Sequence, residues 1–282
     1  DIERENLLVQ PNAFGKTDVT EVIPGIGVAY SGLPRTTIFG GIHRGFSPPR
    51  AEDIISNTGG VVELDPEESI NYELGFRTNP IRGTRLEGTY FRLDYDNQVI
   101  PASLAGGIGA VLTNGGKTLQ EGFEFSAQVD SSAFFGSRHN VYLRTAYTWI
   151  PTAEFRGERF SAIDKTVSIT GNRLPYAPKT LMTTAIGYSH ARGFDGFIEG
   201  VYTGRQFADD LNTVDPTPNG QRGAIGSQTY FNATANYKIE NWKTTFFVTV
   251  KNIFDRLSIV DRTRGIYPST PRLIQAGLKM NF

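Results

Sequence analysis

The feature that most constrains the fold of this chain is the regular alternation of short and long connections between segments with a β-strand pattern. In such a segment, apolar and polar residues alternate with a period of two. In "GFEFSAQVD", for example, Phe123, Phe125 and Val129 lie on one face, and Glu124 and Gln128 lie on the other. About twelve strands of this kind are predicted in the 282 residues, near 2–9, 22–31, 35–46, 70–78, 85–96, 119–130, 139–150, 180–190, 194–206, 228–239, 243–255 and 272–282.

The connections between these segments indicate the class of fold. Short ones read "SGLPR", "NPIRGT", "SSAFFGSRH", "HARG" and "ENW", and they alternate with long ones at 10–21, 47–69, 97–118, 151–179, 207–227 and 256–271. Long loops without secondary structure are uncommon in soluble domains, and a β-sandwich gives no reason for the alternation. The strands of a transmembrane barrel do run between short periplasmic turns and longer extracellular loops. We therefore expect an all-β, antiparallel transmembrane β-barrel.

The charged residues of the predicted strands favour the barrel over the alternative, an ordinary amphipathic sheet of a soluble protein. Burying many charges in a dry core is prohibitive, whereas a water-filled lumen accepts them. No run approaches the 18 apolar residues that predict a transmembrane helix. The chain has no cysteine, which excludes disulfides and thiolate metal sites, and its net charge of -1 gives no reason to expect a nucleic-acid partner. The polar face carries Glu73, Arg77, Glu124, Gln128, Asp130, Arg144, Glu199, Arg205, Lys238, Lys251 and Lys279.

Aromatic residues gather near the predicted strand ends, where the girdles of a barrel would meet the two membrane interfaces. Tyr30, Tyr188, Tyr237 and Trp242 are near predicted periplasmic ends, and Tyr147 and Trp149 are near an extracellular end. The final strand, which ends "QAGLKMNF", places its even-numbered apolar residues toward lipid. This ending resembles the C-terminal signal that the bacterial outer-membrane insertion machinery recognises. The residues expected to form that signal are Gln275, Gly277, Met280 and Phe282.

Four further stretches carry a family resemblance that covers essentially the whole chain. They are "GGIHRGFSPPR" at 40–50, "LDPEESINYELGFR" at 64–77, "YFRLDYDNQVI" followed by "NGGKTLQEGFEF", and the terminal "TVKNIFDRLSIVDRTRGIYPSTPRLIQAGLKMNF" with Asn252 and Asp255. Together they resemble TonB-dependent outer-membrane receptors, which are 22-stranded, plug-containing transporters of iron chelates and related nutrients. The resemblance implies binding and energised transport, not catalysis.

The sequence departs from that family in one large respect. The plug, the TonB-contacting box ahead of it and about ten further strands are not found in it, and "DIERENLLVQ" at its start does not read as a signal peptide. We therefore expect residues 1–282 to be the C-terminal part of a receptor barrel, with no plug domain in this sequence. A complete twelve-stranded barrel is the alternative, since even-numbered barrels start at about eight strands.

Within the family, four stretches look most like receptors of the ferric dicitrate class: "TAYTWIPTAEFRGERF", "GNRLPYAPKTL", "GRQFADDLNTVDPTPNGQRG" and "IVDRTRGIYPSTPR". That resemblance implies an anionic, carboxylate-rich ferric chelate as ligand, which arginine side chains grip bidentately. It also implies outer-membrane lipid and lipopolysaccharide as surroundings, the barrel insertion machinery as a partner, and coupling to the TonB-ExbB-ExbD system through a plug. The expected ligand-binding residues are Arg205, Arg222, Arg262 and Arg264, with Gln206, Asn212 and Gln221 as neutral partners.

Two other functions share parts of this pattern. A passive porin would have the same barrel and polar lumen, but it gives no reason for the receptor-type motifs. An outer-membrane phospholipase needs a histidine beside a serine nucleophile, and the sequence around His43, His139 and His190 does not resemble such an enzyme. No cofactor is expected, and no metal site either: Asp209, Asp210 and Asp215 in "FADDLNTVD" match no cation-binding loop and are expected to stabilise a turn.

Overall fold

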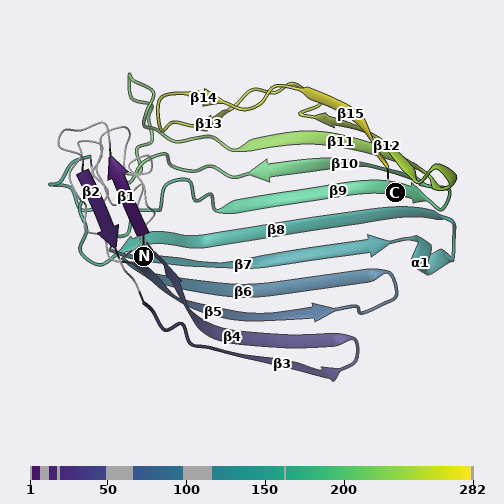
Figure 1. Cartoon of the computed structure of the whole chain (residues 1–282), viewed down its shortest axis with the longest axis horizontal. Helices are drawn as coiled ribbons and strands as arrows, with labels where there is room; N and C mark the ends of the chain where they lie inside the picture. The colour runs from purple at the N-terminus through teal and green to yellow at the C-terminus, as the bar shows by residue number, and fades with distance from the viewer. Residues whose placement is uncertain are drawn as a thin grey trace.

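The computed structural model describes residues 2–6, 13–17, 20–48, 66–97, 116–161 and 163–280. Its main element is one antiparallel sheet of eleven strands, in which the strands follow one another in chain order and β15 pairs with β12 (Figure 1). The strands are β3 (Gly25–Leu33), β4 (Thr36–Ser47), β5 (Glu67–Thr78), β6 (Thr84–Asp96), β7 (Lys117–Asp130), β8 (His139–Arg156), β9 (Thr180–His190), β10 (Phe194–Thr203), β11 (Gln228–Ile239), β12 (Thr244–Lys251) and β15 (Leu273–Met280).

Two short hairpins stand outside this sheet. One joins β13 (Ile259–Asp261) to β14 (Tyr267–Pro268) within a long connection. The other joins β1 (Ile2–Asn6) to β2 (Ala13–Thr17). The strand predicted near residues 2–9 is therefore not a stave of the main sheet, because its partner is β2, in the segment predicted as the connection 10–21. The other eleven predicted strands all join the sheet.

One face of the sheet is apolar and exposed. On β5, Ile70, Leu74 and Phe76 are 44%, 60% and 40% exposed. The register continues this row sideways: Tyr90 of β6 pairs with Phe123 of β7, and the Phe123 ring lies 5.9 Å from that of Trp149 on β8. Soluble monomers rarely expose a contiguous apolar surface of this extent. The face therefore has the character that the barrel prediction requires toward lipid.

The opposite face carries polar side chains that bond to one another across the strands. The Arg77 Nε donates to Glu87 Oε1 at 2.8 Å, and Asn232 Nδ2 donates to Glu199 Oε1 at 3.0 Å. These groups come from positions that alternate with the apolar row, as the period of two demands. They form the polar surface that the sequence predicts for a lumen.

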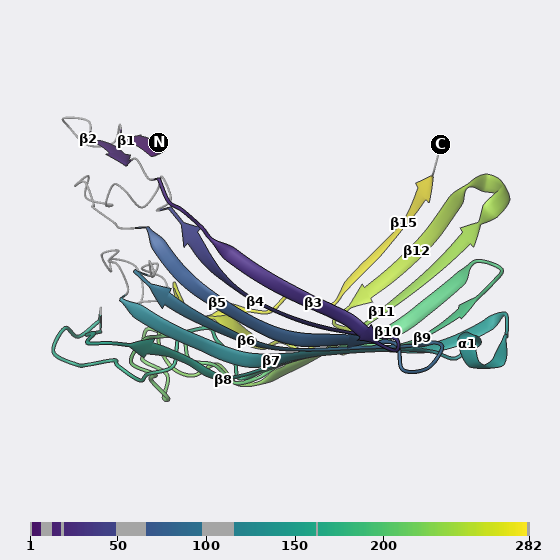
Figure 2. The same ribbon diagram turned by 90° about the horizontal axis from the view of Figure 1, so that it is seen from below.

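The short and long connections separate to opposite ends of the sheet, as Figure 1 shows. The short end holds the tight turns together with α1 (Ser132–Phe135) and the 3₁₀-helix η1 (Glu240–Trp242). No helix in the described part of the chain is both long and apolar enough to span a membrane. Seen from the side, the sheet curves strongly, with β3 and β15 as its two open edges (Figure 2).

Strand β8 extends further than predicted, to Arg156 instead of residue 150. The extension includes Pro151, which lacks the N–H that a strand ladder uses. The structure accommodates it at a register shift between Glu121 and Phe123 of β7, a position where a missing donor is tolerated. Residues 151–156 therefore extend β8 among the long connections.

The C-terminal strand has a packing requirement at Gly277, one of the residues of the predicted insertion signal. A Cβ at this position would lie 2.7 Å from Cζ of the Phe247 ring on β12. Glycine therefore leaves the space that this ring occupies. Gln275 and Met280 lie on the polar and apolar faces of β15 respectively, whereas Phe282 is outside the described residues.

Candidate functional site

The connections at the long end pack on a small core of their own. Ala153 and Phe155 at the end of β8 contact Ile169 and Leu174 of the 157–179 connection, and all four are buried. Leu211 of the 204–227 connection packs against the same cluster. Because apolar burial is the main stabilising term in folding, this cluster fixes the described part of the loops against the end of β8.

Polar contacts join the 157–179 and 204–227 connections. Asn212 has a positive φ of 54°, and its side-chain amide pairs reciprocally with the backbone of Arg173. The Arg173 N–H donates to Asn212 Oδ1 at 2.8 Å, and Asn212 Nδ2 donates to the Arg173 carbonyl at 2.8 Å. The Tyr176 N–H donates to the Phe207 carbonyl at 2.8 Å. These bonds hold the two connections in one register.

Asp209 organises the 204–227 connection from a fully buried position. Its Oδ1 accepts from the Thr213 hydroxyl at 2.8 Å and from the backbone N–H groups of Leu211 and Thr213. Beside it, the buried Asp210 accepts from the Ser161 hydroxyl at 2.9 Å. Asp209 thus has the turn-stabilising contacts that the sequence analysis expects, and Asp210 bonds to the 157–179 connection. The described residues contain no cluster of histidine and carboxylate groups suited to a metal ion.

A tyrosine latch ties in the third connection, 252–272. The Tyr176 hydroxyl donates to Asp261 Oδ1 at 2.6 Å and accepts from the Arg262 N–H at 3.0 Å. Burial and the bond to Asp261 raise the pKa of Tyr176. Burial alone would raise the pKa of Asp261, but the hydrogen bonds from Thr263, Tyr176 and the backbone outweigh it and lower that pKa. The latch therefore contains an ionised carboxylate at neutral pH.

The family motif around Asn252 and Asp255 forms the start of this third connection. Both residues have positive φ angles, 51° and 52°, which asparagine and aspartate tolerate better than most residues. Asn252 Nδ2 donates to the carbonyls of Arg256 and Thr270, and Asp255 Oδ1 accepts from the Arg272 N–H at 2.7 Å. The motif shapes the entry and exit of the loop.

Of the seven residues expected to bind ligand, one asparagine and one arginine are engaged within the loops and three arginines are not; the two glutamines are described below. Asn212 and Arg262 are engaged within the loops: Arg262 is 3% exposed, and its Nη1 donates to the Gly220 carbonyl at 3.0 Å. Arg205 and Arg264 are exposed, and Arg222 is half-buried. The Arg205 guanidinium lies 5.7 Å from the centre of the Phe207 ring.

Among the described residues, the guanidinium groups of Arg205, Arg222 and Arg264 have no ion-pair partner. The two glutamines are half-buried. Gln206 is paired through its backbone with Ile225, and Gln221 Oε1 accepts from Asn219 Nδ2 at 2.8 Å.

Arg173 is not among the site residues predicted from the sequence. In the structure its guanidinium donates to three backbone carbonyls, those of Ala177 at 2.7 Å, Pro151 at 3.1 Å and Ile150 at 2.8 Å. It closes the 157–179 connection onto the end of β8. Only the neighbouring glycine, asparagine and proline residues of "GNRLPYAPKTL" hinted at a tight backbone arrangement here.

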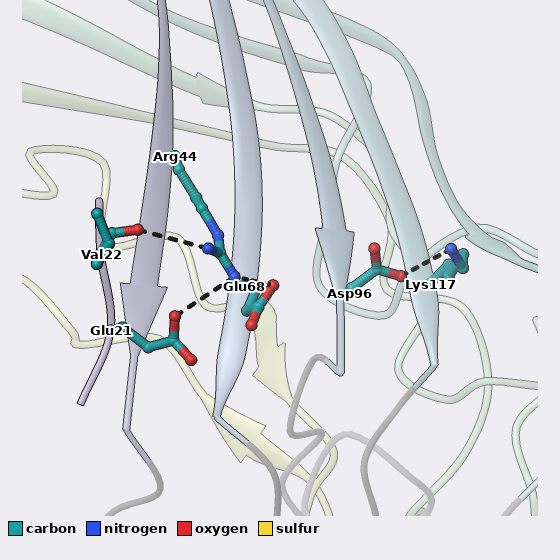
Figure 3. A network of polar contacts seen from close by, with 6 residues as sticks. All are labelled: Glu21, Val22, Arg44, Glu68, Asp96 and Lys117. Carbon is teal, nitrogen blue, oxygen red and sulfur yellow. Dashed lines mark hydrogen bonds and ion pairs between the residues drawn. The ribbon is translucent and has the colours of Figure 1, made fainter. Parts of the chain in front are cut away.

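A group of ion pairs, which we name the charged collar, lies where β4, β5, β6 and β7 begin or end beside the long connections (Figure 3). Arg44 Nη2 pairs with Glu68 Oε2 at 2.7 Å and with Glu21 Oε2 at 3.4 Å, and Lys117 Nζ pairs with Asp96 Oδ1 at 3.1 Å. The pairs of Arg44 are half-buried and that of Lys117 is exposed, and ion pairs so open to solvent add little stability. They do mark where the exposed apolar surface of the strands ends.

Comparison with known proteins places this architecture. Residues 4–253 match the family described as TonB dependent receptor-like, beta-barrel. The unliganded ferric citrate transporter FecA superposes with a TM-score of 0.68 at 23% identity, over 95% of this chain and 38% of that one. The siderophore receptor PirA from Acinetobacter baumannii gives 0.66 at 18%, over 96% and 41%. The ferric yersiniabactin uptake receptor FyuA from Yersinia pestis gives 0.64 at 18%, over 94% and 37%.

At these identities the solved structures establish the fold, and the chain spans about two-fifths of the length of each of them. The family match covers most of the chain and rests on its sequence. The chain therefore belongs to the TonB-dependent receptor-like β-barrel family.

Proposed function

We propose that this chain is the C-terminal part of an outer-membrane receptor that imports a ferric chelate of the ferric dicitrate type. Members of its family are transporters, which sets the phospholipase alternative aside. The solved receptors are longer than this chain, so the substrate, the energy source and the course of transport are all part of this proposal.

The observation that carries the proposal is the interlocked loop cluster, which leaves Arg205, Arg222 and Arg264 without ion-pair partners among the described residues. A ferric citrate complex is anionic and presents several carboxylates. Guanidinium groups bind carboxylates through two parallel hydrogen bonds, and loops already held by Asn212, Tyr176 and Arg262 lose little freedom on binding. The name of the structural relative FecA, a ferric citrate transporter, points to the same ligand class.

The two open edges of the sheet support the idea of a larger barrel. An unpaired edge strand cannot face lipid because its N–H and C=O groups would have no partner there. We propose that further strands pair with β3 and β15, and that a plug inside the barrel faces the polar side chains. Energy then comes from TonB-ExbB-ExbD through that plug, while lipopolysaccharide surrounds the charged collar.

The experiment is uptake of radioactive iron, supplied as ferric dicitrate, by cells whose only ferric citrate receptor is the full-length protein. Uptake is expected in cells with TonB and not in cells without it. Uptake that is equal in both strains would identify a passive channel, and uptake in neither would remove ferric citrate as the ligand. Swelling of liposomes containing the purified protein serves as the control, since a plugged receptor does not leak.

A further inference from the structure

The short turns of the sheet carry an excess of positive charge, although the whole chain has a net charge of -1. Each of its five turns carries one exposed cation, and the only acid in these turns is Glu240. Lys238 neutralises that carboxylate at 2.8 Å. The five cations, which chelate binding at the opposite end does not use, are Arg35, Arg82, Arg138, Arg192 and Lys243.

Large aromatic side chains are exposed at the same end. Tyr30 is 58% exposed, Phe135 81%, Tyr237 47% and Trp242 65%. Tyrosine and tryptophan collect at the level of lipid headgroups because their rings are apolar and their tips are polar. The cations lie in the turns at the same end of the sheet, and long basic side chains at a membrane interface reach the headgroup phosphates.

Two of the turns meet in one basic cluster, which we name the rim cluster: Arg138, His139, His190 and Arg192. His139 of β8 pairs with His190 of β9, and their rings lie 4.6 Å apart. The Ala191 N–H donates to the Arg138 carbonyl at 3.0 Å, which brings the two turns together. Within the described residues, neither arginine of the rim cluster has an ion-pair partner.

The apolar face continues directly from the rim cluster. Tyr188, whose hydroxyl lies 2.7 Å from His139 Nδ1, pairs with Val141 in the sheet. Val141 and Ile186 are 55% and 62% exposed. A lipid with its phosphate at the rim cluster would therefore place its hydrocarbon chains against these strands. A free phosphate ion has no apolar part to contact this surface.

We propose that the rim cluster binds the headgroup phosphate of an acidic phospholipid in the periplasmic leaflet of the outer membrane. The two guanidinium groups supply charge and bidentate hydrogen bonds to the phosphodiester, and the histidine rings and the Tyr188 hydroxyl add further polar contacts. The remaining turn cations extend the positive rim around the barrel. This proposal rests on one part of the proposed function, namely that the sheet lies in the outer membrane.

The test is native mass spectrometry of the full-length receptor in detergent, titrated with phosphatidylglycerol and with phosphatidylcholine of the same chain length. The wild type is expected to prefer phosphatidylglycerol. The variant Arg138→Gln/Arg192→Gln is expected to bind it about 30-fold more weakly, from the usual contribution of two cations at a membrane surface, with phosphatidylcholine binding unchanged. Replacement of both arginines by lysine is expected to restore most of the preference.

The matched control is Lys165→Gln/Arg256→Gln, which removes two exposed cations from the long-loop end and is expected to leave lipid binding unaltered. Equal binding of the two lipids by the wild type, or no loss in the Arg138/Arg192 variant, would overturn the proposal. So would displacement of phosphatidylglycerol by inorganic phosphate at equal concentration, since that indicates a simple anion site. Ferric dicitrate binding is measured on the same samples: its absence alongside lipid preference would contradict the receptor function and leave the lipid site standing.

Discussion

The tyrosine latch, the contact of the Tyr176 hydroxyl with Asp261 and Arg262, is expected to stabilise the 252–272 connection by an amount that can be measured. Tyr176→Phe removes one hydroxyl that donates to Asp261 Oδ1 at 2.6 Å and accepts from the Arg262 N–H at 3.0 Å. The ring stays in place, so packing is conserved. Because Arg262 is buried, its N–H is left without a partner, and the ionised Asp261 loses one of its donors.

The size of the effect follows from these contacts. A hydrogen bond to a charged group contributes about 1.5–3 kcal/mol. Tyr176 is only half-buried, which favours the lower part of that range. We expect the free energy of opening of the 252–272 connection to fall by about 2 kcal/mol, and amide hydrogen exchange there to become about 30-fold faster.

Hydrogen exchange followed by mass spectrometry on the full-length, detergent-purified receptor measures this directly. Peptides from 256–268 report the latch, and peptides from β8 and β9 are expected to stay protected. Tyr267→Phe is the matched control, because Tyr267 is 47% exposed and its hydroxyl bonds to no described residue. Unchanged exchange in the Tyr176→Phe protein would refute the claim that this hydroxyl holds the connections together.

Three further predictions concern the latch, the loops and the last strand. The pKa of Asp261 is lowered in the fold, so its contribution to the stability of the latch is present above the unfolded pKa of about 4 and is lost as pH falls below that value. Amide hydrogen exchange at 256–268, corrected for intrinsic rates, is therefore expected to stay constant between about pH 7 and 5 and to become faster at lower pH. Arg173→Gln removes the bonds to three carbonyls and is expected to expose 157–179 to limited proteolysis, with Arg173→Lys rescuing little; equal digestion of all three proteins would contradict this. Gly277→Val places a side chain against the Phe247 ring and is expected to lower the yield of heat-modifiable folded barrel, at a cost of about 1–3 kcal/mol. Ala276→Val, on the apolar face opposite Val248, is expected to leave that yield unchanged.

The sequence was sufficient to predict the sheet because its strands follow a two-residue period and its turns are short. Eleven strands were found within a few residues of the predicted positions. Errors arose where a local pattern had a non-local outcome. The segment at 2–9 has a strand pattern, but its partner is β2. Strand β8 continues past residue 150 to Arg156 because a register shift on β7 accommodates Pro151.

The candidate site was less predictable, for a physical reason. An arginine in a loop sequence reads the same whether it binds ligand, caps carbonyls or packs under a neighbouring loop. The structure separates these cases: Arg173 bonds to backbone carbonyls, Arg262 is buried against Gly220, and Arg205 is exposed. The hydrogen bond between Tyr176 and Asp261 joins residues far apart in the chain, and no periodic pattern in the sequence predicts such a contact.

The measurement that tests the central claim most directly is a fluorescence-quenching titration of the full-length, detergent-purified receptor with ferric dicitrate and with several other ferric chelates. The wild type is expected to bind ferric dicitrate tightly and saturably. Arg205→Gln/Arg222→Gln/Arg264→Gln is expected to weaken binding by about 100-fold or more, since each charged hydrogen bond contributes about 1.5–3 kcal/mol, and Lys165→Gln/Arg256→Gln is expected to bind as the wild type does. Superimposable curves for the triple variant and the wild type, or saturation only by a different chelate, would contradict the account.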